Sequence, residues 1–187
     1  MTRLLRNALL LLLSIALLLW LLAWQAGWQP QPLEDVPVSC SGPAKPLAPG
    51  QQLKVMTWNV QYLAGKRYVF WYDEAGGSDT RPTDEDLAFN LDEVARVIRA
   101  EQPDIVLLQE LDKGAKASDY QDQLALLRER LADLYPCAAQ AYQWKAEFVP
   151  ERHVFGSVGR TLATLSRYTI EQAQRVQLPQ QDDNVLS

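Results

Sequence analysis

An uncharged, strongly apolar run limits what this chain can fold into more than any other feature of its sequence. Residues 8–24 read ALLLLLSIALLLWLLAW, 17 residues without a charged side chain. A helix over residues 8–28 rises about 30 Å, which matches the apolar core of a bilayer. We therefore expect residues 1–28 to form an N-terminal transmembrane anchor.

Positive charge precedes this run, at Arg3 and Arg6. Because such charge favours the cytoplasmic side, we expect a single-pass protein of the cell membrane with a cytoplasmic N-terminus and its domain on the extracytoplasmic side. A cleaved signal peptide is the alternative, since it shares the basic end and the apolar run. Its cleavage site needs small residues in an A-x-A arrangement, which AWQA at 23–26 does not supply. The sequence therefore favours an uncleaved anchor.

The residues beyond the anchor divide into a linker and one domain. Residues 29–52 contain six prolines and no apolar periodicity, which is typical of a semi-extended spacer. Residues 53–187 are numerous enough to bury a core as one folded domain. Outside Arg3 and Arg6 the chain has 16 basic and 23 acidic residues, which disfavours non-specific binding to nucleic acid. Cys40 and Cys137 either pair in an oxidising compartment or are unrelated.

Apolar patterns within residues 53–187 predict alternating strands and helices. Helices are expected after a cap at Thr83, ending before Pro103, and from Ser118 to before Pro136. Strands are expected over 53–58, 105–108, 138–144, 161–166 and 168–177. This order favours an α/β fold in which the helices pack on a sheet. The long aromatic connection over 61–82 is either a functional loop or part of the core.

Two polar residues follow the first two predicted strands. Asn59 ends the strand at 53–58, and Glu110 follows the apolar strand at 105–108. The carboxyl ends of parallel strands meet at one edge of a sheet, where ligands collect in open α/β folds. A carboxylate and an amide oxygen suit Mg²⁺, which also keeps waters and accepts phosphate ligands. The alternative is an ordinary turn-forming asparagine and an exposed glutamate.

Three segments of the chain, taken together, strengthen the interpretation as a magnesium site. They read KVMTWNV at 54–60, PDIVLLQE at 103–110 and LATLSRYTI at 162–170. In this order and spacing they resemble the endonuclease/exonuclease/phosphatase family of Mg²⁺-dependent phosphoesterases. The resemblance implies an α+β fold in which this chain holds the N-terminal part of a two-sheet sandwich flanked by helices. It implies that Asn59 and Glu110 bind Mg²⁺, or Mn²⁺ in its place, with Glu110 as the direct ligand. Gln109 matches a positioning residue, and Ser166 and Arg167 match the scaffold.

The resemblance also implies in-line attack of water on a phosphodiester or phosphomonoester, with a histidine held by an aspartate as general base. The family's D-x-N and S-D-H elements do not follow the third segment, and residues 182–184 read as a polar tail. We therefore expect a C-terminally incomplete domain in which no catalytic residue is identifiable. His153, the only histidine, either contacts phosphate or lies on the surface. Further phosphate contacts that the sequence does not rank are Lys66, Arg67, Arg81 and Arg160.

Together these observations predict a membrane-anchored, Mg²⁺-dependent phosphoesterase, nuclease-like or phosphatase-like, with weak or no activity as this chain alone. The anchor and the acidic charge favour a lipid-linked or small phosphoester over nucleic acid as the substrate. The alternative is a non-catalytic fragment, either a binding module or the product of an interrupted gene, because a fold does not determine a function.

Overall fold

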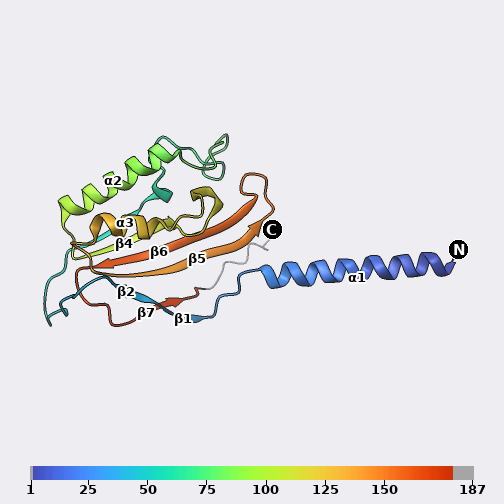
Figure 1. The fold of residues 1–187 in the computed structure, drawn as a ribbon, viewed down its shortest axis with the longest axis horizontal. Coiled ribbons are helices and arrows are strands. Elements are labelled where there is room, and N and C mark those ends of the chain that lie inside the picture. The colour runs from blue at the N-terminus through green and yellow to red at the C-terminus, as the bar shows by residue number, and fades with distance from the viewer. Residues whose placement is uncertain (1, 179–187) are drawn as a thin grey trace, which may run out of the picture.

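The computed structural model describes residues 2–178 as an N-terminal helix followed by a mixed α/β domain (Figure 1). Helix α1 (Thr2–Ala26) extends away from the domain, and none of its apolar segment Arg3–Leu21 is buried. The segment has a mean hydropathy of 2.2 and is long enough to cross a membrane. A signal sequence near an N-terminus has the same properties. The expected apolar helix is therefore present, as an anchor or as a signal sequence.

The domain is built from seven strands and two longer helices within the described residues. The strands are β1 (Leu33–Val36), β2 (Val38–Cys40), β3 (Val55–Asn59), β4 (Ile105–Asp112), β5 (Cys137–Val149), β6 (Gly156–Ser166) and β7 (Ala173–Val176). The helices are α2 (Asp84–Glu101) and α3 (Gln123–Leu131), with short 3₁₀ turns η1 (Gln61–Leu63) and η2 (Lys116–Ser118). Five strands form the main sheet, in the order β2-β5-β6-β4-β3, and β1 pairs with β7 in a small second sheet. Only β3 and β4 are parallel neighbours in the main sheet.

Helices α2 and α3 cover one face of the main sheet and enclose the core (Figure 1). Thr83 begins α2 as predicted, because its side chain accepts a hydrogen bond from the Asp86 N–H. Ile98 of α2, Leu127 of α3 and Leu108 of β4 belong to one buried cluster. Each such side chain contributes about 1.5–3 kcal/mol when it leaves water. This packing holds β4, which carries the candidate site, in the middle of the domain.

The opposite face of β3, β4 and β6 carries exposed apolar side chains. Val55, Leu107 and Leu162 are 52%, 37% and 43% exposed, because side chains alternate between the two faces of a strand. The sequence prediction of a mixed α/β chain, with a sheet flanked by helices and an N-terminal helix apolar enough to span a membrane, is confirmed.

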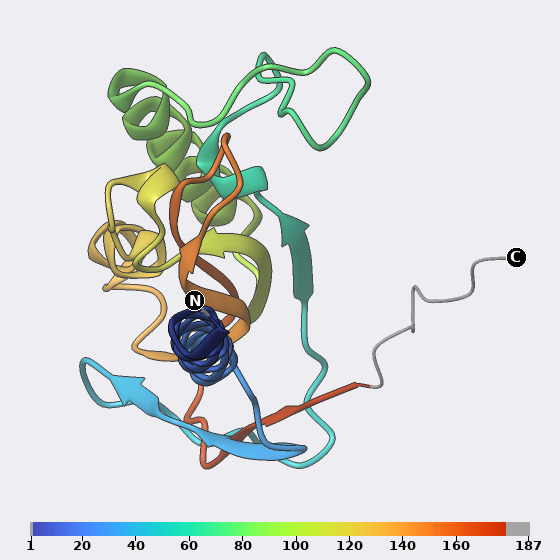
Figure 2. The same ribbon diagram turned by 90° about the vertical axis from the view of Figure 1, so that its right-hand side faces the viewer.

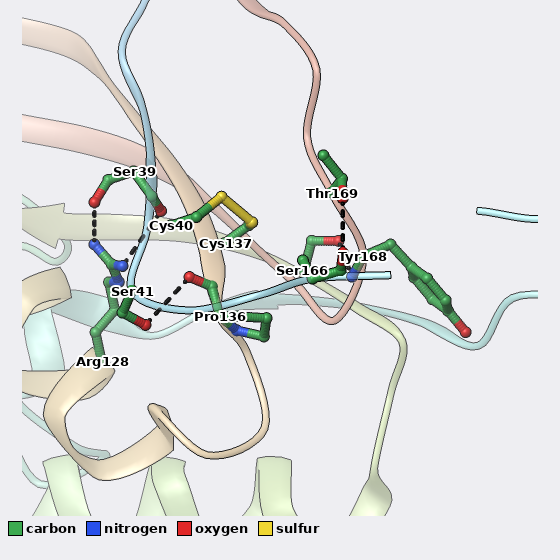
Figure 3. The surroundings of a disulfide bond; sticks show 10 residues. Ser39, Cys40, Ser41, Arg128, Pro136, Cys137, Ser166, Tyr168 and Thr169 are labelled. Atoms are coloured by element: carbon green, nitrogen blue, oxygen red, sulfur yellow. Dashed lines mark hydrogen bonds between the residues drawn. A yellow bond between two sulfur atoms is a disulfide. The ribbon is translucent and has the colours of Figure 1, made fainter. Parts of the chain in front are cut away.

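The proline-rich segment over 29–52, expected to be a spacer, contributes strands to both sheets. Strand β2 pairs with β5, and a disulfide joins Cys40 to Cys137 across that pair (Figure 3). Beside it, Arg128 of α3 donates a hydrogen bond of 3.0 Å to the Ser39 hydroxyl. Strands β1 and β2 lie on either side of Pro37, so the prolines interrupt the pairing without preventing it. Part of the expected linker therefore belongs to the domain.

Several predicted elements have different bounds in the structure, and the strand expected over 168–177 is present only as β7 (Ala173–Val176). Helix α3 begins at Gln123, capped by the Asp122 carboxylate, which accepts from the Ala125 N–H at 3.2 Å. Ser118, the predicted start, lies in η2 because the chain makes a separate 3₁₀ turn there. Strands β5 and β6 are longer than expected and form one antiparallel hairpin. The predicted polar tail at 182–184 lies outside the described residues.

Candidate functional site

Strands β3 and β4 bring the two expected metal-binding residues to one end of the main sheet. The strands are parallel, and Asn59 pairs in register with Gln109, so Glu110 follows beside it. Asn59 is exposed, and its Oδ1 accepts a hydrogen bond of 2.9 Å from the Gln61 N–H. This bond orients the Asn59 side chain at the start of a turn in which residues 61–63 all have positive φ.

Glu110 lies in a β-bulge of β4. The register with β6 shifts between Leu108 and Leu111, so two residues of β4 oppose one residue of β6. Glu110 has a φ of 56°, in the left-handed region that residues other than glycine rarely occupy. Its carboxylate is partly buried and forms no hydrogen bond or ion pair with any residue that the structure describes. A strained residue with a free carboxylate in a bulge is typical of a ligand-binding position.

A second carboxylate, Asp112, lies at the same end of β4 but is buried. Its residue is 5% exposed, and its backbone N–H donates to the Gln123 Oε1 at 2.8 Å. Burial raises the pKa of Asp112 to about 6, although a hydrogen bond with Ser118 and the charge of Arg160 act in the opposite direction. The negative charge of Glu110 makes a smaller contribution that also raises the pKa of Asp112.

Arg160 brings positive charge to this end of the sheet. It is the register partner of Asp112 across β4 and β6. Its guanidinium carbon lies 5.2 Å from the ring centre of Tyr72, 5.4 Å from that of Tyr62 and 5.7 Å from that of Trp144. Among the described residues, the guanidinium has no hydrogen-bond or ion-pair partner, so its N–H groups are free to bind an anion. Burial raises the pKa of Tyr72 to about 12, although the positive charge of Arg160 acts in the opposite direction.

Asp112, Arg160 and Tyr72 border a cavity of about 600 Å³, whose lining does not include Asn59 or Glu110. Its aromatic wall includes Trp71 and Tyr72 from the connection over 61–82 and Trp144 from β5. Asp112 and Arg160 contribute a carboxylate and a guanidinium to the same wall. A largely apolar cavity with a few convergent polar groups is the usual form of a small-ligand site. The aromatic connection therefore forms part of a candidate binding site.

His153 lies on the same cavity wall, in the loop between β5 and β6. Its Nδ1 is 2.9 Å from the Glu151 Oε1, and its ring stacks on Trp71 with 4.8 Å between ring centres. The side chain is 26% exposed. When Nδ1 donates to Glu151, Nε2 is the ring nitrogen that remains for a ligand.

The other residues singled out by the sequence support the sheet. The Gln109 Nε2 donates to the Thr57 Oγ1 at 3.1 Å and to the Leu107 carbonyl at 3.2 Å, so it connects β4 to β3. The Ser166 Oγ accepts a hydrogen bond of 3.0 Å from the Tyr168 N–H at the end of β6 (Figure 3). The side chains of Gln109 and Ser166 therefore both form hydrogen bonds with backbone groups, and Gln109 is the neighbour of Glu110 in the chain.

The donor set at this end of the sheet fits a hard divalent cation. Glu110 offers a free carboxylate and Asn59 offers an amide oxygen, and Mg²⁺ in proteins commonly takes one or two carboxylates together with waters and substrate phosphate. Within residues 2–178, no three His, Cys, Asp or Glu side chains are grouped so as to hold a metal ion. The residues therefore suit an ion whose coordination is completed by water and substrate, and they do not form an all-protein cage.

The sequence did not identify Asp112, and it could not single out Arg160 or the cavity. A second acid two residues after Glu110, in the segment QELD, was a local signal for Asp112. Arg160 is one of 18 basic residues, and only the pairing of β6 with β4 brings it to the site. The cavity is formed by segments far apart in the sequence, so no local pattern predicts it.

Among the comparisons with known proteins, a family model identifies the family of this chain. A family model described as the endonuclease/exonuclease/phosphatase family matches residues 56–186. A solved structure with the description "endonuclease/exonuclease/phosphatase from Beutenbergia cavernae DSM 12333" is 27% identical, with a TM-score of 0.34. That similarity covers 62% of this chain and 26% of the solved one, so the chain matches about a quarter of the length of that protein. A comparison with curated proteins found no match.

Proposed function

Because the chain belongs to the endonuclease/exonuclease/phosphatase family, we propose that it is a membrane-anchored phosphoesterase that depends on Mg²⁺, which Mn²⁺ can replace. Membership of this family indicates a phosphoesterase or a nuclease-type hydrolase. The observation that carries the finer proposal is the partly buried, unpaired carboxylate of Glu110, held beside Asn59 at the end of two parallel strands. Glu110 and Asn59 are the residues that would hold the metal.

In this proposal the metal ion, Arg160 and the aromatic wall of the cavity have different roles. When bound, the metal ion neutralises negative charge that develops on phosphate oxygens. Arg160 donates its free N–H groups to the phosphate, since a guanidinium matches the geometry of phosphate oxygens. The aromatic wall formed by Trp71, Tyr72 and Trp144 excludes water and orients the organic part of the substrate.

The reaction in this proposal is hydrolysis of a phosphate ester. A water oxygen forms a new bond to phosphorus, the ester P–O bond breaks, and the leaving oxygen takes up a proton while the attacking water loses one. A general base of the histidine–aspartate type has no counterpart at a matching position within residues 2–178. The described histidine–carboxylate pair is instead His153 with Glu151, on the cavity wall. We therefore propose weak activity for this chain acting alone, whereas complete inactivity would favour the alternative, a non-catalytic fragment.

The proposed substrate is a lipid-linked or small phosphoester in preference to nucleic acid. A cavity of about 600 Å³ has room for a small organic phosphate, and the sequence carries a net charge of −5. That negative charge repels a polyanion, whereas a single phosphate needs only local positive charge such as that of Arg160. Localisation in the cell membrane, with the domain on the extracytoplasmic side, belongs to the same proposal.

The test is Mg²⁺-dependent turnover by the full chain in phospholipid nanodiscs, with a chromogenic phosphodiester, a phospholipid and an oligonucleotide as parallel substrates. The proposal expects hydrolysis of the first two that chelation removes and that Glu110→Ala abolishes. Glu129→Ala, which removes an exposed glutamate on α3, is the matched control and leaves the rate unchanged. Equal rates for Glu110→Ala and the wild type overturn the metal assignment. Turnover of the oligonucleotide alone overturns the substrate class, and no turnover of any substrate favours a non-catalytic binding module.

A further inference from the structure

The end of the β5–β6 hairpin presents two exposed aromatic rings next to each other, one from β5 and one from the loop that follows it. Phe148 and Phe155 are 55% and 59% exposed. Their rings meet edge to face, with 5.1 Å between ring centres and 78° between ring planes. Residues 148–155, which we call the hairpin tip, therefore carry an apolar pair of which more than half remains exposed. A single exposed phenylalanine needs no explanation, but a paired aromatic tip points to a binding surface.

The backbone of the hairpin tip holds one of these rings outward in a strained conformation. Phe155 has a φ of 32°, which is rare for a bulky residue. Its N–H donates to the Glu151 carbonyl at 2.7 Å, and its own carbonyl accepts from the Lys116 Nζ at 2.8 Å. Gly156 makes the second contact feasible, because a Cβ there would lie 2.4 Å from the Lys116 Cδ. The exposure of Phe155 is thus maintained by specific contacts, as is usual for functional strain.

The hairpin tip lies at the end of the domain from which α1 extends. In Figure 1 the loop between β5 and β6 and the junction with α1 are both at the right-hand end of the domain. Figure 2, which looks along α1, shows the β5–β6 hairpin next to that helix. The end of α1 also lies close to β5. A bilayer that α1 crosses would therefore begin at the level of the hairpin tip.

We propose that the hairpin tip docks on the phospholipid bilayer that α1 crosses, with the rings of Phe148 and Phe155 in the interfacial layer. The proposal rests on the proposed anchoring by α1. Aromatic rings favour the depth of the headgroups, and basic side chains next to them are attracted to lipid phosphates. Lys116 lies 5.8 Å from the ring centre of Phe155, and Arg152 is exposed within the same tip.

Docking of the tip has a consequence for the candidate site. Residues 149 and 151–154 of the same tip line the cavity that also contains Asp112 and Arg160. Seating Phe148 and Phe155 in the interface therefore brings the cavity wall to the level of lipid headgroups. This placement extends the proposed function to a substrate class. Membrane lipids with a phosphoester headgroup would reach the cavity directly from the bilayer.

The test measures depth in the membrane at single positions of the full chain. Phe155→Cys and, separately, Phe148→Cys are labelled with a fluorophore that lipids carrying a nitroxide quench, and the chain is reconstituted in phospholipid nanodiscs. The disulfide between Cys40 and Cys137 leaves no other thiol to react. Leu11→Cys, within α1, reports a residue in the bilayer. Phe89→Cys is the matched control, since Phe89 is a 64% exposed phenylalanine on α2.

The proposal expects loss of fluorescence at positions 148, 155 and 11 when nitroxide lipid is included, and no loss at position 89. Quenching at 11 but not at 148 and 155 overturns the docking of the tip. Quenching at 89 as well shows unspecific contact of the domain with lipid and also overturns it. A label at position 11 that is not quenched shows that α1 does not cross the bilayer, and this result overturns the docking as well. These outcomes are independent of turnover and of Glu110, so failure of the docking and failure of the proposed hydrolysis are distinguishable.

Discussion

The disulfide between Cys40 and Cys137 ties the proline-rich segment to the main sheet, and its removal has a calculable effect. The bond connects β2 to β5 and closes a loop with a sequence separation of 97. Chain entropy for a loop of that length predicts about 4.7 kcal/mol of stabilisation, which acts by restricting the unfolded chain. A domain of this size is stable by about 5–15 kcal/mol in total. We therefore predict that Cys40→Ser removes a large part of the free energy of unfolding.

Two variants separate the loop effect from the packing effect. Cys40 is exposed, so Cys40→Ser reports the loss of the cross-link, whereas Cys137 is 0% exposed and Cys137→Ser also buries a hydroxyl. The assay is urea unfolding of the full chain in detergent micelles, followed by tryptophan fluorescence. The reduced wild type must unfold like Cys40→Ser, and Cys137→Ser must be less stable than both. A loss of less than about 1 kcal/mol in Cys40→Ser would refute the loop-entropy argument.

Three further predictions use the same unfolding assay. Ile98→Ala empties a fully buried position of α2 and lowers the free energy of unfolding by about 2–5 kcal/mol, whereas an effect near zero contradicts the placement of the core. Gly159→Ala places a Cβ 1.9 Å from the Lys113 carbonyl oxygen, so we expect loss of the folded state at 25 °C, and a wild-type unfolding curve refutes that close approach. The pKa of Asp112 is raised from 3.8 to about 6 by burial, so the folded protein holds a proton that the unfolded chain releases, and stability falls as pH rises through this window. Asp112→Asn, measured in EDTA, therefore gains up to about 3 kcal/mol relative to the wild type between pH 4 and pH 7, and parallel pH profiles contradict the raised pKa.

Local patterns were sufficient for the parts of the fold that depend on local forces. The cap at Thr83 and the apolar stripe that includes Ile98 predicted α2, because helix capping and the burial of one helix face depend on residues that are close in the sequence. The apolar run at 105–108 predicted β4 for the same reason, and parallel pairing then placed Asn59 beside Glu110. The candidate metal-binding pair was accessible from the sequence because Asn59 ends β3 and Glu110 directly follows the apolar run of β4.

The remaining features depend on contacts between distant segments. The bulge at Glu110 arises where β4 pairs with β6. Glutamate is not a residue type that indicates a left-handed conformation, so the sequence did not predict it. Arg160 faces Asp112 only through strand register, and burial then raises the pKa of that carboxyl group. The strands within the proline-rich segment form because β5 and β7 provide partners. Composition alone indicated a spacer there, since it contains no information about partners.

Binding of Mn²⁺, a paramagnetic substitute for Mg²⁺, directly tests whether Glu110 holds a metal ion. Electron paramagnetic resonance of the full chain in detergent micelles measures the free Mn²⁺ that remains, and Mg²⁺ is added as a competitor. We predict that the wild type and Glu129→Gln bind Mn²⁺, that Mg²⁺ displaces it, and that Glu110→Gln binds none. Binding by Glu110→Gln equal to that of the wild type would contradict the assignment of Glu110 as the metal ligand.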